Sequence, residues 1–512
     1  MRGLVFISIL FALPAEPADW PTFGHDPQRS GWAFQETTIN RDNAATLVLK
    51  WKAKLPSESY SLSALTAPVV ASDVSTERGV RTAVYVAGIG GTVFALDSET
   101  GEQLWSRTFK YRIQPGKGGF QGSFLCPNGV TATPVIDKST HILYVIAADG
   151  ALYGLDLGSG GIRYGPVQFV ASYAKAWSLS LVNGVVYTTL SQGCGAGLSG
   201  LYGVDVRDRH HPVVYQLLLS NSDTAGIWGR GGPIIGDNGR VYGSTADGRF
   251  DPAAGDYSNT VISASLPNLE LLDYYLPPNW DYLRKKDLDL GSASPVFFGW
   301  KNRRVVATGT KEAVVSLLDA ESLGGADHQT TLFTSPQLAN EKGICCAGLG
   351  IWGGLSTARD LQGQTWLYVP MGGPPASTVT FPLSNGDAPH GSIMAFKVTA
   401  DAQTQNPKLE PAWISGDFDI PDPPIIANGV LFALATGENA VQRGGEKNRF
   451  LNTHPAVLRA LDAATSKELF NSKDAIASWV HFSGLAIANG QVYVVDHDSN
   501  VYAFGLPAKQ GK

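Results

Sequence analysis

A pattern that recurs eight times along the chain limits the folds that this sequence can adopt. The clearest copies have an alternating Val- and Tyr-rich segment, a Gly or Asp turn, and a second segment ending in Leu-Asp, and the fullest copy covers residues 83–105. Two alternating segments around one glycine turn are typical of a β-hairpin. Equivalent central positions of the copies are Tyr85, Tyr144, Tyr187, Tyr242, Val306, Tyr368, Phe432 and Tyr493. Because a four-stranded unit cannot bury both faces alone, eight such units predict an all-β fold, an eight-bladed β-propeller.

The last copy, around Tyr493, is short by one strand. Too few residues follow 501–504 for an outer strand, whereas residues 47–53 near the N-terminus have no repeat of their own. We therefore expect residues 47–53 to form the outer strand of the last blade, which would close the ring and remove its open edges. A single propeller domain would then cover residues 19–512.

The N-terminus resembles an export signal. Met1 and Arg2 precede an apolar stretch, residues 3–13, and a segment rich in Pro and Ala follows. This order predicts a secretory signal peptide over residues 1–18, and hence a periplasmic or extracellular protein. A buried N-terminal strand is the alternative, but it explains neither the leading charge nor the following prolines. No later segment reaches the roughly 20 apolar residues of a transmembrane helix, so we expect no membrane span.

Charge and cysteine content exclude two classes of protein. With 39 basic and 45 acidic residues, the net charge of -6 offers no basic field for a nucleic acid. None of the four cysteines belongs to a Cys-x-x-Cys-His sequence, which excludes covalently attached c-type haem. In an oxidising compartment the cysteines can form disulfides. The adjacent residues Cys345 and Cys346 form either a vicinal disulfide or two buried thiols.

Two segments carry a resemblance to a known family. Residues 95–105, Ala-Leu-Asp-Ser-Glu-Thr-Gly-Glu-Gln-Leu-Trp, are similar to the tryptophan-docking motif of pyrroloquinoline quinone (PQQ) enzyme repeats, and residues 20–31 are similar to the start of such propellers. The chain thus resembles the PQQ-dependent quinoprotein alcohol dehydrogenases and their PQQ-like propeller relatives. The resemblance implies PQQ with calcium or a lanthanide in the central funnel, an alcohol or sugar substrate, and a separate electron acceptor.

The same resemblance assigns roles to five residues. Trp228, in a Gly-Ile-Trp-Gly sequence, would stack on PQQ, and Lys311 would bind the quinone oxygens. Asp287 would be the catalytic base that takes the proton of the substrate hydroxyl. Asp247, Asp287 and Asp289 would bind the metal ion. Each residue also has a structural explanation: a tryptophan packed between blades, aspartates that accept hydrogen bonds in a sharp loop, and a solvated lysine in a turn.

The sequence departs from the family pattern in three places. Asp247 stands where the family has an asparagine ligand, which changes the charge balance of the site. Gly195 stands where the family has a glutamate ligand. Should PQQ fail to bind, this missing ligand would be the reason, and cation-dependent PQQ binding created by a Gly195→Glu change would support that explanation. The adjacent cysteines, Cys345 and Cys346, lie between the fifth and sixth blades, and a single cysteine, Cys126, stands at the position of the family's pair. Some PQQ-like relatives have single cysteines where Cys126 and Cys194 lie, so we expect these two to approach closely enough to bridge.

Two functions therefore remain open from the sequence. One is a secreted or periplasmic PQQ oxidoreductase that acts on an alcohol or sugar, and the other is a cofactor-free propeller that binds a protein or polysaccharide. His481 is interpreted as a residue of the funnel wall or core rather than as a base. Binding of PQQ would distinguish the two functions.

Overall fold

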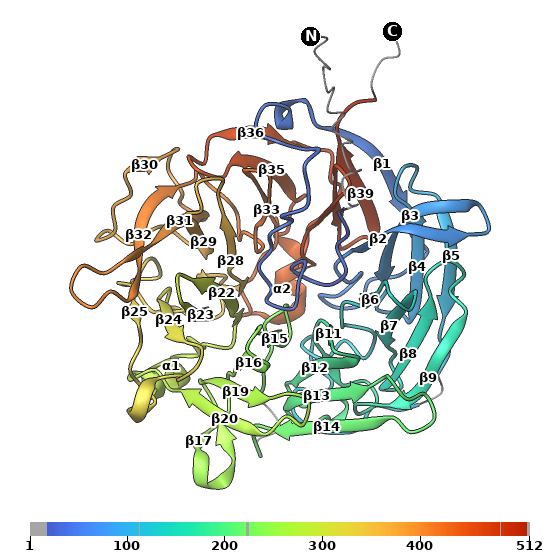
Figure 1. The fold of residues 1–512 in the computed structure, drawn as a ribbon, viewed down its shortest axis with the longest axis horizontal. Helices are drawn as coiled ribbons and strands as arrows, with labels where there is room; N and C mark the ends of the chain where they lie inside the picture. Colours follow the sequence, from blue (N-terminus) through green and yellow to red (C-terminus); the bar gives the residue numbers. More distant parts are fainter. Residues whose placement is uncertain (1–17, 112, 222–224, 482, 509–512) are drawn as a thin grey trace, which may run out of the picture.

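The described residues form eight mainly antiparallel sheets arranged as blades around a central axis (Figure 1). The computed structural model describes residues 18–111, 113–221, 225–481 and 483–508, so the predicted signal peptide lies outside them except for Ala18. All eight central positions predicted from the repeats fall in the second strand from the axis of their blade. The predicted eight-bladed propeller is confirmed.

The blades follow one another along the chain, and within each the strands run outward from the axis. Blade 1 consists of β2 (Val69–Thr76), β3 (Gly79–Ala87), β4 (Thr92–Asp97) and β5 (Gln103–Thr108), and blade 2 of β6 (Val135–Asp137), β7 (Ile142–Ile146), β8 (Ala151–Asp156) and β9 (Ile162–Gln168). Blade 3 consists of β10 (Lys175–Ala176), β11 (Ser180–Val182), β12 (Val185–Ser191), β13 (Gly200–Asp205) and β14 (Val213–Leu218), and blade 4 of β15 (Ile234–Ile235), β16 (Arg240–Ser244), β19 (Val261–Ser265) and β20 (Leu271–Tyr275). Blade 5 consists of β22 (Val296–Trp300), β23 (Arg303–Gly309), β24 (Val315–Asp319) and β25 (Phe333–Thr334), and blade 6 of β26 (Gly350–Ile351), β28 (Ser356–Arg359), β29 (Thr365–Gly372), β31 (Gly391–Ala400), β32 (Pro407–Ile414) and β30 (Leu383–Ser384). Blade 7 consists of β33 (Ile425–Ala427), β34 (Val430–Ala435), β35 (Val457–Asp462) and β36 (Glu468–Asn471), and blade 8 of β37 (Ala486–Ala488), β38 (Gln491–Val495), β39 (Asn500–Gly505) and β1 (Val48–Lys54).

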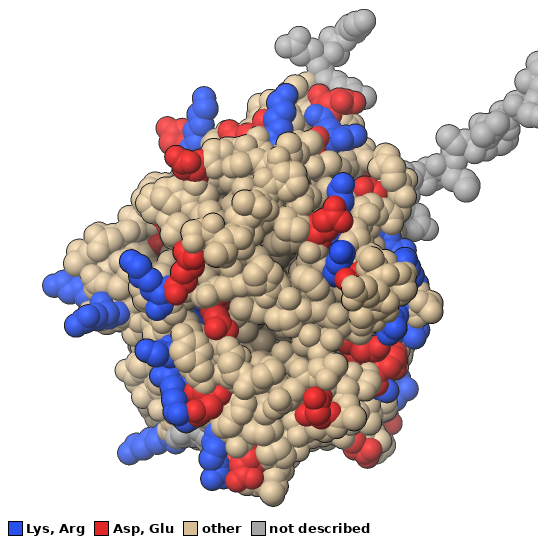
Figure 2. Space-filling view, turned by 90° about the vertical axis from the view of Figure 1, so that its left-hand side faces the viewer, with Lys and Arg blue, Asp and Glu red and all other residues tan. Residues whose placement is uncertain are grey.

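Short elements decorate this ring. They are the ribbon of β17 (Phe250–Asp251) and β18 (Asp256–Tyr257), the parallel pair of β21 (Ala293–Ser294) and β27 (Gly353–Gly354), and the helices α1 (Trp280–Lys286) and α2 (Gly445–Leu451). In the described part of the chain, no helix has both the length and the apolar character that a membrane crossing requires. Acidic and basic side chains are interspersed on the face drawn in Figure 2, which carries no continuous basic patch.

Strand β1 closes the ring. It pairs antiparallel with β39, with Val48 opposite Gly505 and Lys54 opposite Asn500, and becomes the outermost strand of blade 8. The prediction that residues 47–53 complete the last blade is therefore confirmed, with the strand one residue further along the chain.

Tryptophan side chains on outer strands dock blade 8 onto blade 1 and blade 1 onto blade 2. Trp51 Nε1 of β1 donates a hydrogen bond to the carbonyl oxygen of Ser98 in blade 1, at 2.7 Å. Trp105 Nε1 donates in the same way to Leu157 in blade 2, at 2.8 Å. A Cβ at Gly101, which has φ +72°, would lie 2.6 Å from the Trp51 ring. This glycine of the docking motif is needed because the indole of the preceding blade occupies its side-chain position.

Replacing Trp51 with alanine is expected to destabilise the closed ring by about 3–5 kcal/mol, because the change removes a large buried side chain and leaves a cavity. The loss should appear as a lower midpoint of denaturant unfolding. Leu49→Ala, on the same strand with 39% of its residue surface exposed, is the matched control and should have a much smaller effect. Equal midpoints for the two variants would contradict docking as the means of closure.

The chain that precedes β1 crosses the axis of the propeller, as Figure 1 shows in blue. We call residues 18–36 the axial segment. Its backbone bonds to the innermost strand of six blades through the pairs Trp20–Val70, Pro21–Ile136, Pro27–Ile235, Gln28–Phe297, Ser30–Thr357 and Gly31–Ile426. The Arg29 side chain reaches blade 3 at Leu179, and Glu36 Oε2 accepts from the backbone N–H of Gly490 in blade 8. The axial segment therefore contacts all eight blades.

Candidate functional site

A cavity of about 200 Å³ lies at the centre of the propeller. Its wall includes Trp228, Asp247, Asp287 and Lys311, four of the five residues that the sequence analysis singled out. The fifth, Asp289, is 1% exposed and lies behind this wall against Lys311. The register of the repeats thus places the predicted residues of blades 4 and 5 around one space.

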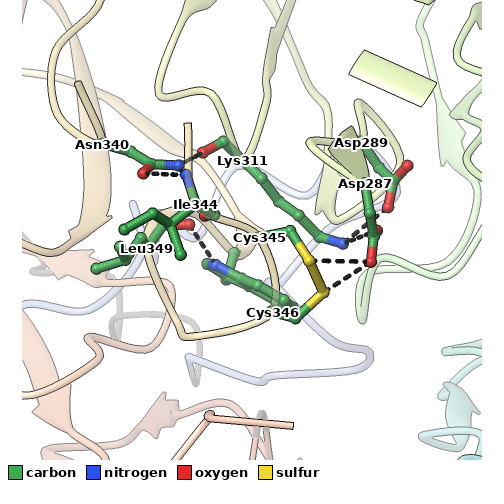
Figure 3. Close-up of a disulfide and its surroundings, with 9 residues drawn as sticks. Asp287, Asp289, Lys311, Asn340, Ile344, Cys345, Cys346 and Leu349 are labelled. Carbon is green, nitrogen blue, oxygen red and sulfur yellow. Dashed lines mark hydrogen bonds and ion pairs between the residues drawn. A yellow bond between two sulfur atoms is a disulfide. The ribbon is translucent and has the colours of Figure 1, made fainter. Parts of the chain in front are cut away.

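The Lys311 ammonium points toward the carboxylates of Asp287 and Asp289 (Figure 3). Its Nζ is 2.7 Å from Asp287 Oδ1 and 2.7 Å from Asp289 Oδ2, and the side chain is 2% exposed. The same Nζ lies 4.8 Å from the ring centroid of Trp228 and 4.9 Å from that of Trp352. Two carboxylates and two indoles therefore surround one buried cation, so Lys311 is not the solvated turn lysine of the alternative interpretation.

The backbone around Lys311 is tightly constrained. Asp287 follows α1 in the left-handed conformation at φ +53°, which turns the chain sharply toward Asp289. The backbone N–H of Lys311 donates to Asp289 O at 3.2 Å, and Asn340 Nδ2 donates to Lys311 O at 2.8 Å. A Cβ at Gly350, where φ is +84°, would lie 2.0 Å from Lys311 O. Only glycine permits this approach, so blade 6 packs directly on the turn that carries the lysine.

Burial shifts the proton affinities of the acidic groups in the cavity. Burial raises the pKa of Asp287, and this effect outweighs the opposing effect of the Lys311 ammonium. Burial, together with the Asp289 carboxylate, also raises the pKa of Asp247. Burial lowers the pKa of Lys311, but Asp289 and Asp287 more than offset it, so the net shift is upward. Lys311 is therefore protonated at neutral pH, and Asp287 has the character of a base stronger than a solvated carboxylate.

A vicinal disulfide borders the site next to the Asp287 carboxylate (Figure 3). Of the two alternatives that the sequence left open, the structure has the Cys345–Cys346 disulfide. Asp287 Oδ2 lies 2.7 Å from the Cys346 sulfur and 3.4 Å from the Cys345 sulfur. Asn340 holds this loop, since its Oδ1 accepts from Ile344 N and its Nδ2 donates to Ile344 O. The adjacent cysteines thus reach the funnel although they lie elsewhere in the sequence than in the family.

Cationic side chains form a further part of the cavity wall. Lys175 Nζ donates to Gln192 Oε1 at 2.9 Å and lies 5.0 Å from the ring centroid of Trp177. The Arg230 guanidinium lies 5.5 Å from the same ring, and Arg449 of α2 is ion-paired with Glu438. Burial, together with the charges of Arg230 and Arg449, lowers the pKa of Lys175 to about 7. This wall suits a ligand that carries negative charge.

A second disulfide crosses the funnel wall near Lys175. Cys126 and Cys194 are bonded with their Cα atoms 5.4 Å apart, which confirms the expected approach. The neighbouring Gly195 has φ +63°, and a Cβ there would lie 2.1 Å from Ser172 O. This backbone has no room for a side chain, so a Gly195→Glu change would disturb the fold here and is a poor test of the missing ligand.

Trp352 is a functional candidate that the sequence analysis did not single out. Trp352 lies in a second Gly-Ile-Trp-Gly sequence, residues 350–353, and its ring centroid is 6.3 Å from that of Trp228. The shared motif was the signal that could have paired them. His481 lines the cavity as expected, and its Nδ1 lies 2.8 Å from both carboxylate oxygens of Glu438.

The carboxylates fit a hard cation poorly. Ligand oxygens of Asp247, Asp287 and Asp289 lie within 4.8 Å of one another, as a metal site requires. Calcium takes six to eight oxygens, however, and two of the oxygens here bind Lys311 instead. A calcium or lanthanide ion on these three residues stays a prediction.

Comparison with known protein families gives a match over part of the chain. Residues 20–165 match the family described as glucose/ethanol/alcohol dehydrogenase, β-propeller domain (PQQ). A search of curated proteins found no sequence relative.

Three solved structures resemble nearly the whole chain. A quinohemoprotein alcohol dehydrogenase from Comamonas testosteroni has 14% identity and a TM-score of 0.57, over 97% of this chain and 82% of that one. A europium-containing methanol dehydrogenase has 14% identity and a TM-score of 0.62, over 96% and 98%. A quinohemoprotein alcohol dehydrogenase from Pseudomonas putida HK5 has 12% identity and a TM-score of 0.58, over 97% and 82%. At these identities the likeness shows the fold alone. Residues 20–165 thus match the PQQ β-propeller domain family, and the described chain has the fold of the quinoprotein alcohol and methanol dehydrogenases.

Proposed function

We propose that this protein is a PQQ-binding oxidoreductase that oxidises the hydroxyl group of an alcohol or sugar in the central cavity. The observation that carries the proposal is the meeting of Asp287, Lys311 and Trp228 in one cavity that also has a cationic wall. The predicted export signal adds the proposal that it works in the periplasm or outside the cell, with a separate electron acceptor.

The residues of the cavity fit the chemistry of PQQ. This cofactor is a planar quinone with three carboxyl groups, and it supplies a two-electron acceptor when bound. Trp228 and Trp352 offer aromatic surface for its rings, and Trp228 Nε1 is a buried donor with no hydrogen-bond partner among the described residues. Lys175 and Arg230 offer positive charge for its carboxylates.

Asp287 is proposed to take the proton of the substrate hydroxyl. Its side chain is half-buried at the cavity wall, and the raised pKa of its carboxylate makes it a better proton acceptor than a solvated aspartate. Lys311 holds Asp287 Oδ1, which leaves Oδ2 as the oxygen that is not engaged by the ammonium. Lys311 also neutralises the buried Asp289, so that the charge of Asp289 is not left without a partner.

Titration of the purified protein with PQQ tests this proposal. We expect saturable quenching of tryptophan fluorescence, because Trp228, Trp352 and Trp177 all line the cavity. Lys175→Met should weaken PQQ binding about 10- to 100-fold, the effect of losing one charge-assisted hydrogen bond in a buried site. Lys467→Met, which removes an exposed lysine on blade 7, should leave the affinity unchanged.

Absence of saturable PQQ binding by the unaltered protein would overturn the proposal. The second candidate, a cofactor-free propeller that binds a protein or polysaccharide, would then replace it. The contact of the Cys345–Cys346 disulfide with Asp287 Oδ2 favours that second candidate, because it limits access to the carboxylate.

A further inference from the structure

Lys311 occupies the position between carboxylates that a metal ion would need. Its Nζ is 2.7 Å from Asp287 Oδ1 and from Asp289 Oδ2, and Asp247 completes the acidic cluster. We propose that the Lys311 ammonium is the resident cation of this cluster, and that the protein therefore binds neither calcium nor a lanthanide there.

The contacts of the Lys311 side chain and backbone fix the position of its ammonium group. The indoles of Trp228 and Trp352 both lie within 4.9 Å of Nζ, measured to their ring centroids, and the side chain is 2% exposed. The backbone of Lys311 is fixed by Asn340 and by the close approach of Gly350. A metal ion on Asp287 and Asp289 would therefore lie beside a buried ammonium of the same sign of charge, which opposes its binding.

The supply of oxygen ligands points in the same direction. With one oxygen of Asp287 and one of Asp289 bound to Lys311, at most four carboxylate oxygens of the cluster remain for a metal ion, fewer than calcium normally takes. Blade 3 adds no side-chain oxygen ligand at Gly195, because an added Cβ there would lie 2.1 Å from Ser172 O. The lysine thus meets the charge requirement of a cluster that lacks enough ligands for a metal ion.

This inference concerns the cavity of the proposed function, but it stands on the contacts of Lys311 and holds whether or not PQQ binds. Its test therefore measures metal binding by the protein without PQQ. Terbium is a suitable probe, since the two indoles beside Lys311 would sensitise the luminescence of an ion in this position.

We expect no saturable terbium luminescence from the unaltered protein between micromolar and millimolar concentrations. Lys311→Met should create saturable emission that calcium competes away, because it leaves the buried Asp289 carboxylate without its partner. Adding Asp289→Asn to Lys311→Met should weaken that binding roughly tenfold or more. Lys467→Met is the matched control and should behave like the unaltered protein.

A measurement on the unaltered protein keeps the test decisive if Lys311→Met does not fold. A ligand that binds only the folded state raises the melting temperature, so the unaltered protein should melt at the same temperature in calcium and in a chelator. A calcium-dependent rise in that temperature, abolished in Asp289→Asn, would overturn the proposal. Micromolar terbium binding by the unaltered protein with competition by calcium would overturn it as well.

Discussion

Replacing Asp287 with asparagine is expected to reduce turnover of an alcohol substrate by about 10²- to 10⁴-fold in the PQQ-loaded protein, because the variant lacks the proton acceptor. The fold around the site should survive, since Asp287 has φ +53° and asparagine tolerates this left-handed conformation well. Asp289 also remains as a partner of Lys311 in the variant. Steady-state kinetics and PQQ affinity, measured on the same preparation, would separate a loss of chemistry from a loss of cofactor.

Asp281→Asn provides the matched control for this change. Asp281 lies on α1, six positions before Asp287, where it pairs with Arg284 and Lys285 at the surface. Its replacement should leave turnover and PQQ affinity unchanged. Full turnover by Asp287→Asn would show that another group takes the proton, whereas loss of PQQ binding in that variant would assign Asp287 to cofactor binding.

Replacing Arg29 with methionine should destabilise the propeller by about 3–5 kcal/mol, because several buried acceptors lose their donor together. Arg29 is 3% exposed, and its guanidinium donates to Phe23 O at 2.7 Å and to Leu179 O at 3.0 Å. It also donates to Thr22 Oγ1 and Ser180 Oγ, at 2.8 and 2.7 Å. The bonds to Leu179 and Ser180 join the axial segment to blade 3, and those to Thr22 and Phe23 hold the segment's own turn, so their loss would weaken the centre of the ring.

The midpoint of denaturant unfolding measures the effect of Arg29→Met. Arg41→Met is the control, since Arg41 is 55% exposed in its pair with Asp462, and such surface pairs contribute at most about 1 kcal/mol. A shift for Arg29→Met no larger than that of the control would show that the axial segment does not stabilise the fold.

The repeats made the blades predictable because their hydrogen bonds are local. The partners of strand β3 come from β2 and β4, both within a few residues of its ends, so alternation around one turn identifies them. Closure by β1 was also predictable, because the last copy lacks a strand and one N-terminal segment has no copy of its own. The path of the axial segment was not predictable, since its partners come from every blade and it has no periodic pattern.

The candidate site was predictable where a motif carried it. Asp287 and Lys311 were found through the family resemblance, and the structure places them in contact. The cationic wall was not predictable from the sequence, because its residues come from three different blades and meet only when the ring has formed. These residues are Lys175 of blade 3, Arg230 of blade 4 and Arg449 of blade 7. Nothing in the local sequence of any one of them indicates the other two.

The pairing of β1 with β39 also determines the order of assembly during synthesis. A ribosome makes Val48–Lys54 before any blade, whereas Asn500–Gly505 emerges only when the chain is nearly finished. During almost all of synthesis β1 therefore has no strand to pair with, while the local hairpins encoded between β1 and β39 can already form. Closure is a single late event of very long sequence separation, and a chain that stops shortly before β39 would have a nearly complete set of blades but no closed ring.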